Sequence, residues 1–315
     1  MEVLKVENVV KQFGNYKASN DISFSARKGS VTGLLGPNGA GKTTMIRMIT
    51  NILMPDSGNI FLFGEKIQPA HQNMIGYLPE ERGLYKKVKV IDQLVYFAQL
   101  KGMDKKSAIT AANSWLFRLD AMDWAPKKIQ ELSKGMQQKV QFIVTVLHEP
   151  KLLILDEPFS GFDPINAQLI KNEILELRDK GATIIFSTHN MGSVEELCDN
   201  IALINKAEKL LDGSVKDIRK QYKSNTYHIS FKGNLMGFTN ALWAGAELLD
   251  KKSDDDLHSV TVKLLRQNKP NDLLQAVLST AEILSFQEIV PSMNDIFISV
   301  VENKTTLNTQ SAFTE

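Results

Sequence analysis

A glycine-rich stretch near the N-terminus has the residue types and spacing of a phosphate-binding loop. In this pattern the glycines let the backbone curl so that its N–H groups converge on phosphate oxygens. The lysine supplies a charge for the β- and γ-phosphates, and the hydroxyl group after it ligates Mg²⁺, so Thr43 is a predicted metal ligand. The residues predicted to bind nucleotide here are Gly36, Pro37, Asn38, Gly39, Ala40, Gly41, Lys42, Thr43 and Thr44.

A second group of candidates stands where an apolar run ends in two acids. Residues 152–155 are apolar, and Asp156 and Glu157 follow them directly. A buried parallel strand that ends in acids places them at the carboxyl edge of its sheet, where ligands bind. We predict that Asp156 holds Mg²⁺, usually through water, and that Glu157 accepts a proton from the attacking water. The alternative is a strand that ends in two solvated acids.

The elements around these residues predict an α/β fold. The first thirty residues have the alternation of strands, and residues 31–35 form a short apolar strand that leads into the glycine-rich loop. Residues 43–52 carry apolar side chains at helical spacing, so the helix that follows points its positive end at the bound anion. Residues 151–155 and 182–187 are apolar runs that suit buried parallel strands. Strands that alternate with helices predict a parallel sheet.

Four further segments resemble motifs of the ABC transporter ATPases and stand in that family's order. Leu-Ser-Lys-Gly-Met-Gln-Gln-Lys at 132–139 resembles the signature motif, and Ser-Gly-Phe-Asp at 160–163 resembles the D-loop. Ser-Thr-His at 187–189 looks like the switch histidine, and Phe13 matches the aromatic residue on which adenine stacks. The resemblance covers roughly residues 1–215.

The resemblance implies a fold and a set of roles. The fold is a phosphate-loop, RecA-like parallel sheet with antiparallel-β and helical subdomains, the helical one at about 88–135. ATP and Mg²⁺ would be buried between two head-to-tail protomers. Ser133 and the Gly135 amide would donate to the γ-phosphate on the other protomer, with Asp163 also at the nucleotide, and His189 would hydrogen-bond the γ-phosphate. By residue type alone, Ser133 is an ordinary helix cap and His189 a satisfied histidine at a strand end.

Two residues depart from the family's pattern. Glu80 stands where the family usually has a glutamine that contacts Mg²⁺ and the attacking water and senses the membrane partner. Glu80 could still ligate Mg²⁺, but an ionised carboxylate adds negative charge beside the phosphates and cannot donate a hydrogen bond. Lys134 stands where the signature usually has glycine, and it adds positive charge near the composite site. The alternatives are a solvated loop acid and a solvated lysine.

Composition and length bound the remaining possibilities. The chain has 315 residues with a net charge of +1, which suggests two domains and argues against a dedicated nucleic-acid binder. Its one cysteine, Cys198, excludes an intrachain disulfide and fits a reducing compartment. We see no signal peptide and no apolar run long enough to span a membrane.

A polar stretch near residue 220 predicts a boundary between two domains. We expect an ATPase domain at 1–220, an accessory α+β domain at 221–302 and a polar tail at 303–315. The accessory domain has the order strand–helix–strand–strand–helix–strand, which suggests a ferredoxin-like unit. We see no nucleotide motif, metal-ligand cluster or nucleophile in it, so we assign it regulation or dimer contact, with passive stabilisation as the alternative.

The leading functional hypothesis is the ATP-hydrolysing subunit of an exporter. The two departures and the segment 289–297 resemble a branch of bacterial ABC exporter ATPases that includes the sodium-exporting type. That resemblance implies a second ATPase protomer, separate membrane permease subunits and a location on the cytoplasmic face of the membrane. The alternatives are a soluble mechanical ATPase and a weakly hydrolysing regulatory subunit.

Overall fold

The computed structural model describes residues 1–81, 83–242, 245–265 and 268–312. The chain divides into two compact units, Met1–Val215 and Lys216–Glu315. The division falls five residues before the expected boundary at 220. It lies inside helix α7 (Val215–Gln221), whose polar sequence resembles a linker although its backbone is helical.

A six-stranded sheet forms the centre of the first unit, in the order β10-β9-β3-β8-β7-β6. All neighbouring strands are parallel except β9 and β10, which pair as a hairpin. Three of the central strands are buried along their whole length because helices and a second sheet cover both faces. The strands are β3 (Val31–Leu35), β6 (Ile75–Leu78), β7 (Leu152–Asp156), β8 (Thr183–Thr188), β9 (Asn200–Asn205) and β10 (Glu208–Ser214).

A second, antiparallel sheet in the order β2-β1-β4-β5 contains the strands expected in the first thirty residues. Its strands are β1 (Glu2–Phe13), β2 (Tyr16–Arg27), β4 (Ser57–Leu62) and β5 (Glu65–Lys66). One hydrophobic core joins this sheet, the parallel sheet and helix α1 (Lys42–Ile49). The helix ends three residues earlier than its apolar pattern predicts, because Asn51 takes a left-handed conformation with φ of 54°.

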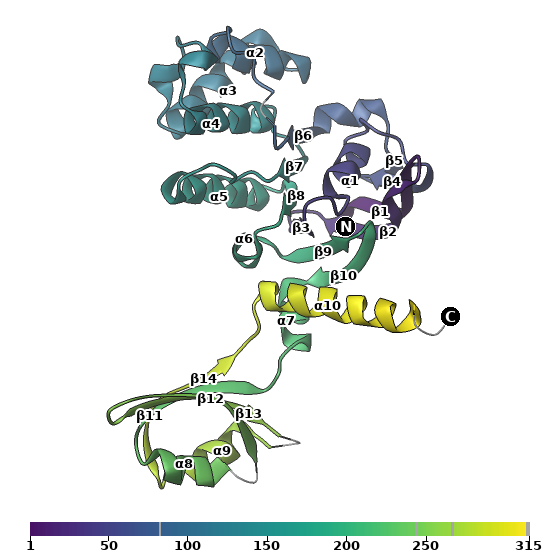
Figure 1. Ribbon diagram of the computed structural model, residues 1–315. Coiled ribbons are helices and arrows are strands. Elements are labelled where there is room, and N and C mark those ends of the chain that lie inside the picture. Colours follow the sequence, from purple (N-terminus) through teal and green to yellow (C-terminus); the bar gives the residue numbers. More distant parts are fainter. Residues whose placement is uncertain (82, 243–244, 266–267, 313–315) are drawn as a thin grey trace. The chain divides into compact units, whose positions relative to one another are not determined.

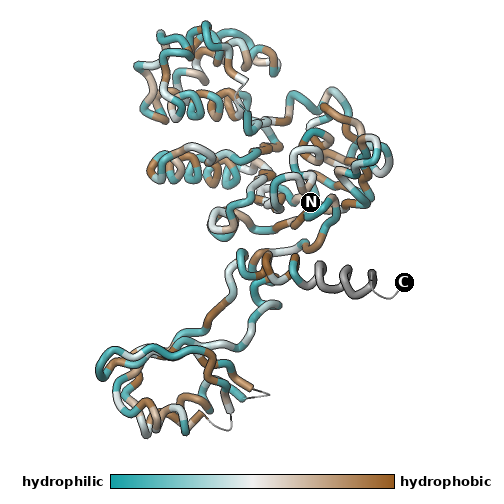
Figure 2. Tube along the Cα trace, in the orientation of Figure 1, coloured by the Kyte–Doolittle hydropathy of each residue, from teal (hydrophilic) through white to brown (hydrophobic). Residues whose placement is uncertain are grey.

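Three helices pack on one another as a group that we call the helical lobe, consisting of α2 (Val90–Leu100), α3 (Lys105–Arg118) and α4 (Lys134–Val146). Figure 1 shows these helices together, with α5 (Pro164–Asp179) alongside α4. Hydrophobic and hydrophilic residues alternate along α4 and α5 (Figure 2), as in helices with one face against a core. Helix α6 (Met191–Leu197) follows β8, and 3₁₀ turns lie at Pro69–Met74, Met122–Trp124 and Ile129–Glu131.

The second unit has the ferredoxin-like order predicted from the sequence. Its antiparallel sheet runs β12-β13-β11-β14, and helices α8 and α9 pack with it around a single core. The elements are β11 (Thr226–Gly233), α8 (Leu235–Leu242), β12 (Ala246–Asp254), β13 (Leu257–Leu264), α9 (Pro270–Val277) and β14 (Ala281–Ile289).

Helix α10 (Met293–Ala312) follows this sheet and extends into the segment 303–315 that we expect to be a polar tail. Residues 303–312 continue the helix, since no glycine or proline interrupts them. Ser292 and Asp295 cap its start, because the Asp295 N–H donates to Ser292 Oγ at 3.1 Å and the Ser292 N–H donates to Asp295 Oδ2 at 3.0 Å. Among the described residues, no helix combines the length and apolarity needed to cross a bilayer.

Candidate functional site

The glycine-rich loop joins β3 to α1 and depends on glycine at two close backbone approaches. Gly36 and Gly41 have φ of 151° and 107°, where side chains are strained. A Cβ on Gly36 would stand 2.1 Å from the Ile204 carbonyl oxygen, and one on Gly41 would stand 2.1 Å from the Ala18 carbonyl oxygen. The loop therefore lies tightly against its neighbouring strands, with its path set by backbone packing.

Lys42 begins α1 and turns its side chain back into the loop. Its Nζ donates to the carbonyl oxygens of Gly36 at 2.7 Å and Pro37 at 3.1 Å. Burial lowers the pKa of Lys42, while the carboxylates of Glu157, Asp156 and Glu80 oppose that shift. The buried ammonium group is thus held by neutral acceptors that a phosphate oxygen could replace.

Asp156 ends β7 at the carboxyl edge of the sheet, where it meets Thr43. Its Oδ2 accepts a hydrogen bond from Thr43 Oγ1 at 3.2 Å, and its Oδ1 accepts one from Ser187 Oγ at 2.8 Å. Burial raises the pKa of Asp156, the two hydroxyl donors oppose the shift, and the charges of Glu80 and Glu157 add to it. A buried carboxylate beside a hydroxyl group and two more acids suits a hard divalent cation, which takes oxygen ligands.

Glu157 follows Asp156 with a positive φ of 48°, and three groups at the end of β8 hold its carboxylate. Oε1 accepts from the His189 backbone N–H at 2.9 Å and lies 2.7 Å from His189 Nδ1. Oε2 accepts from Thr188 Oγ1 at 3.0 Å. The predicted base and the predicted switch histidine are therefore direct partners within one chain.

Sequence reasoning singled out 187–189 for its histidine but gave no role to the two hydroxyl groups before it. Ser187 pairs in register with Asp156 across the parallel strands β7 and β8. Neighbouring parallel strands end at the same edge of a sheet. The polar residues at the ends of β7 and β8 are therefore a sequence signal that could have predicted the contacts of Ser187 and Thr188 with Asp156 and Glu157.

A cavity of about 280 Å³ is lined by residues of the phosphate loop and by the acids Glu80, Asp156 and Glu157. Within the loop, Gly36, Pro37 and Ala40 do not line it, and the first two instead supply the carbonyls that hold Lys42. The lining residues are Tyr16, Asn38, Gly39, Gly41, Lys42, Thr43, Thr44, Glu80, Asp156 and Glu157.

Tyr16 is a lining residue that sequence reasoning missed. Its hydroxyl group donates to the Gly39 carbonyl oxygen at 3.0 Å, and the residue is 56% exposed. Phe13, the predicted adenine platform, pairs with Tyr16 across the β1–β2 turn and is 49% exposed, with Lys11 Nζ 5.6 Å from its ring. The hairpin thus presents two exposed aromatic rings near the loop, and only Tyr16 lines the cavity.

Glu80 borders a second cavity of about 270 Å³, which extends toward the helical lobe. Lys134, the other departure from the family pattern, lines this cavity together with Glu80, Asp156 and Glu157. The two departures therefore lie around one space, with the lysine on the same cavity as three acids. Opposite charges here reduce the excess of negative charge that Glu80 adds.

The remaining predicted residues lie at helix starts and do not line the cavity around Lys42. Ser133 caps α4, with its Oγ accepting from the Met136 N–H at 3.3 Å, and Gly135 lies in the first turn of that helix. Asp163 caps α5 by accepting from the N–H groups of Ile165 and Asn166, each at 3.0 Å. These backbone hydrogen bonds hold the pKa of Asp163 below its usual range.

Comparisons with known proteins identify the families to which the two parts of the chain are similar. Residues 19–160 match the ABC transporter family, and residues 213–301 match the family described as ATP-binding protein DrrA1-3-like, C-terminal domain. The chain is 41% identical to the ABC transporter ATP-binding protein YhaQ of Bacillus subtilis over 95% of its length and 98% of that protein. It is 33% identical to the Nod factor export ATP-binding protein I of Burkholderia lata, over 66% of this chain and 69% of that protein.

A solved structure shares the fold of the first unit. The structure described as the ATP-binding subunit of an ABC transporter superposes with a TM-score of 0.66 at 28% identity. The match covers 70% of this chain and 93% of the chain in the solved structure. With its phosphate loop, its paired acids and these relatives, the chain belongs to the ABC transporter ATP-binding proteins, which are nucleotide-binding ATPases.

Proposed function

We propose that this protein hydrolyses MgATP to drive export through separate membrane subunits, by ATP-dependent closure of two copies of the ATPase unit. The observation that carries the proposal is the cavity that joins Lys42, Thr43, Asp156, Glu157 and Glu80. A buried lysine beside oxygen ligands suits a polyphosphate with a divalent cation.

Each residue of the cavity has a chemical role in this proposal. Lys42 contacts the β- and γ-phosphates after giving up its two backbone acceptors. Thr43, Asp156 and Glu80 hold Mg²⁺, which when bound neutralises charge on the phosphate oxygens. Glu157 accepts the proton of the attacking water, and three hydrogen bonds to its carboxylate fix its orientation. Phe13 and Tyr16 offer aromatic faces to the adenine.

The second copy supplies what the cavity lacks. Ser133 and the Gly135 amide sit at the exposed start of α4, outside the cavity of their own chain, so we assign them to the γ-phosphate on the partner. Asp163, at the start of α5, likewise does not line the cavity of its own chain. We assign His189, whose Nδ1 lies 2.7 Å from Glu157 Oε1, to a hydrogen bond with the γ-phosphate.

The exporter role rests on the relatives and on the second unit. One relative is named for Nod factor export, and the second unit matches a C-terminal domain described as DrrA1-3-like. We place the protein on the cytoplasmic face of a cell membrane, bound to permease subunits, and we assign the second unit to regulation or dimer contact.

Membrane fractionation tests this proposal against a soluble mechanical ATPase. The protein is expressed with and without the neighbouring open reading frames of its operon, and membranes are collected by sedimentation. We expect co-sedimentation only when the membrane subunits are present. A protein that stays in the supernatant in both cases contradicts the exporter role.

A further inference from the structure

An ion cluster joins the end of α3 to α5, and we call Arg118, Glu173, Glu176 and Lys180 the Arg118 cluster. Arg118 Nη1 donates to Glu176 Oε1 at 2.8 Å, and its Nη2 contacts the other Glu176 oxygen, so the pairing is bidentate. Arg118 Nε forms an ion pair with Glu173 Oε2 without hydrogen-bond alignment, and the Glu173 carboxylate is buried. Lys180, the residue that caps the C-terminal end of α5, places its Nζ 2.7 Å from Glu176 Oε1.

The charges in this cluster depend on Arg118. The Arg118 and Lys180 partners lower the pKa of Glu176 to about 2. Burial raises the pKa of Glu173, and Arg118 is the main group that opposes the shift. Without Arg118, the buried Glu173 would be left with an uncompensated charge. Arg118 thus compensates Glu173 and pairs with Glu176, and it links both acids of α5 to the helical lobe.

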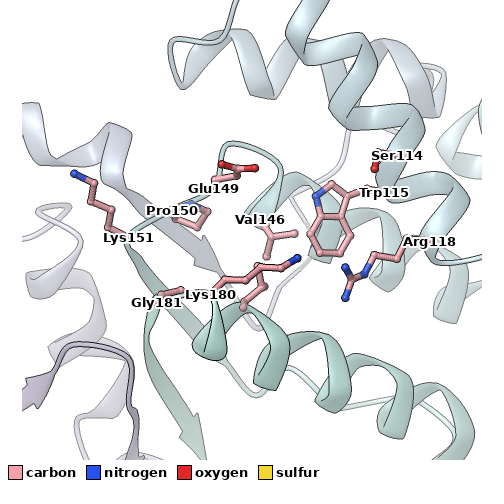
Figure 3. A pocket seen from close by; sticks show the side chains of 11 residues that line it. Ser114, Trp115, Arg118, Val146, Glu149, Pro150, Lys151, Lys180 and Gly181 are labelled. Carbon is pink, nitrogen blue, oxygen red and sulfur yellow. The ribbon is translucent and has the colours of Figure 1, made fainter.

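A cavity of about 380 Å³ lies beside Arg118, lined from α3, the end of α4 and the end of α5. Figure 3 shows the Trp115 ring, Arg118 and Lys180 around it. The Trp115 ring lies 5.2 Å from the Arg118 guanidinium carbon and meets Phe142 of α4 edge-on at 6.0 Å. The guanidinium group is therefore fixed between the lobe's aromatic rings and the acids of α5.

Helix α3, which carries Arg118, packs on α4 through Trp115 and Phe142, and α4 and α5 run side by side in the same direction. The ends of α4 and α5 line the 380 Å³ cavity, at Val146 and Leu177. Their first halves line the 270 Å³ cavity, at Gln138 and Ile170, next to the acids of the site. A tie from α3 to α5 therefore holds α4, through its packing on α3, beside α5, and so affects the separation of the starts of α4 and α5, where Ser133 and Asp163 are the caps.

We propose that Arg118 is a positioning residue for ATP hydrolysis, which ties the helical lobe to α5 and so holds the starts of α4 and α5 in register. The part that concerns the partner's nucleotide rests on the proposed function. The tie itself lies within one chain. Arginine suits it because its planar fork makes two parallel hydrogen bonds to one carboxylate while Nε reaches a second acid.

Kinetics of the full-length protein give the first readout. Arg118→Met keeps the length of the side chain and removes the cation, and we expect kcat to fall about tenfold while the Kd for ATP stays the same, since small misplacements of catalytic groups reduce rate strongly. Arg118→Lys, with one charge but no fork, should recover part of kcat. Arg178→Met is the matched control, because Arg178 pairs with Asp179 on its own helix.

Distances within one chain give the second readout and do not depend on the dimer. Spin labels are placed at the exposed positions Phe117 of α3 and Gln168 of α5, with Cys198 replaced by serine. We expect a narrow distance distribution that Arg118→Met broadens and Arg178→Met leaves unchanged. If Arg118→Met does not fold, Arg118→Met combined with Glu173→Gln removes the unpaired buried charge and takes its place.

The outcomes test the positioning role of Arg118 separately from the head-to-tail dimer. Broadened distances with a reduced kcat support the proposal. Unchanged distances overturn it whatever the rate, and unchanged kcat overturns the positioning role even if the distances broaden. A failure of the head-to-tail dimer appears in the mixed-protomer experiment described below and leaves the distance readout intact.

Discussion

At the scale of single residues, the carboxylate of Glu157 is the clearest target. We expect Glu157→Gln to reduce ATP hydrolysis by roughly 10²- to 10⁴-fold and to leave ATP binding intact, because the amide keeps the shape but cannot accept the proton. The ATP-bound dimer should then accumulate, which size-exclusion chromatography with ATP measures. Glu282→Gln, at an exposed position of the second unit, is the control. Unchanged turnover in Glu157→Gln contradicts the assignment of the base.

Glu80 gives a second prediction at this scale. It borders both the 280 Å³ and the 270 Å³ cavities, between the catalytic acids and the helical lobe. We expect Glu80→Gln to retain basal ATPase activity and to change the stimulation of that activity by the membrane subunits. The adjacent exposed acid Glu81 lines neither cavity, so Glu81→Gln is the matched control. Loss of basal activity would instead show that the negative charge of Glu80, which Gln lacks, is essential for holding Mg²⁺.

At the scale of elements, the start of α4 tests the head-to-tail dimer. Ser133→Ala and Lys42→Ala protomers are mixed, and each mixed dimer contains one site with an intact loop and an intact signature, since both lesions fall in the other site. We expect ATPase activity in the mixture well above that of either variant alone. Mixed dimers are verified by two affinity tags. Equal inactivity of the mixture and both homodimers, with mixed dimers present, argues against Ser133 acting across the interface.

At the scale of the whole molecule, the division into two units predicts that the first unit folds alone. Each unit has its own hydrophobic core. We expect deletion of residues 222–315 to leave a folded, ATP-binding protein with weakened dimerisation or altered control by the membrane subunits. Circular dichroism, ATP binding and size-exclusion chromatography measure these properties, and removal of residues 303–315 alone is the control. A truncated chain that does not fold shows that the units depend on each other for stability.

The sequence by itself determined the elements and most of the predicted chemistry. The phosphate loop, the acids after residues 152–155 and the order of the strands of the second unit all follow from local spacing and periodicity, which depend on residues close together in the chain. The ferredoxin-like order is confirmed by the sheet β12-β13-β11-β14. The helix caps at Ser133 and Asp163 are likewise local, since each accepts from N–H groups two or three residues later.

Only the tertiary structure decided which distant residues meet. The contacts of Glu157 with Thr188 and His189 join two strands that a whole helix separates in the sequence, and Tyr16 at the start of β2 reaches Gly39 in the loop after β3. The tie between Arg118 and the acids of α5 has no local signal, because an arginine at the end of a helix is ordinary in sequence and its partners lie more than fifty residues away. Such contacts depend on how packed layers bring side chains together, and no periodicity within one element encodes that.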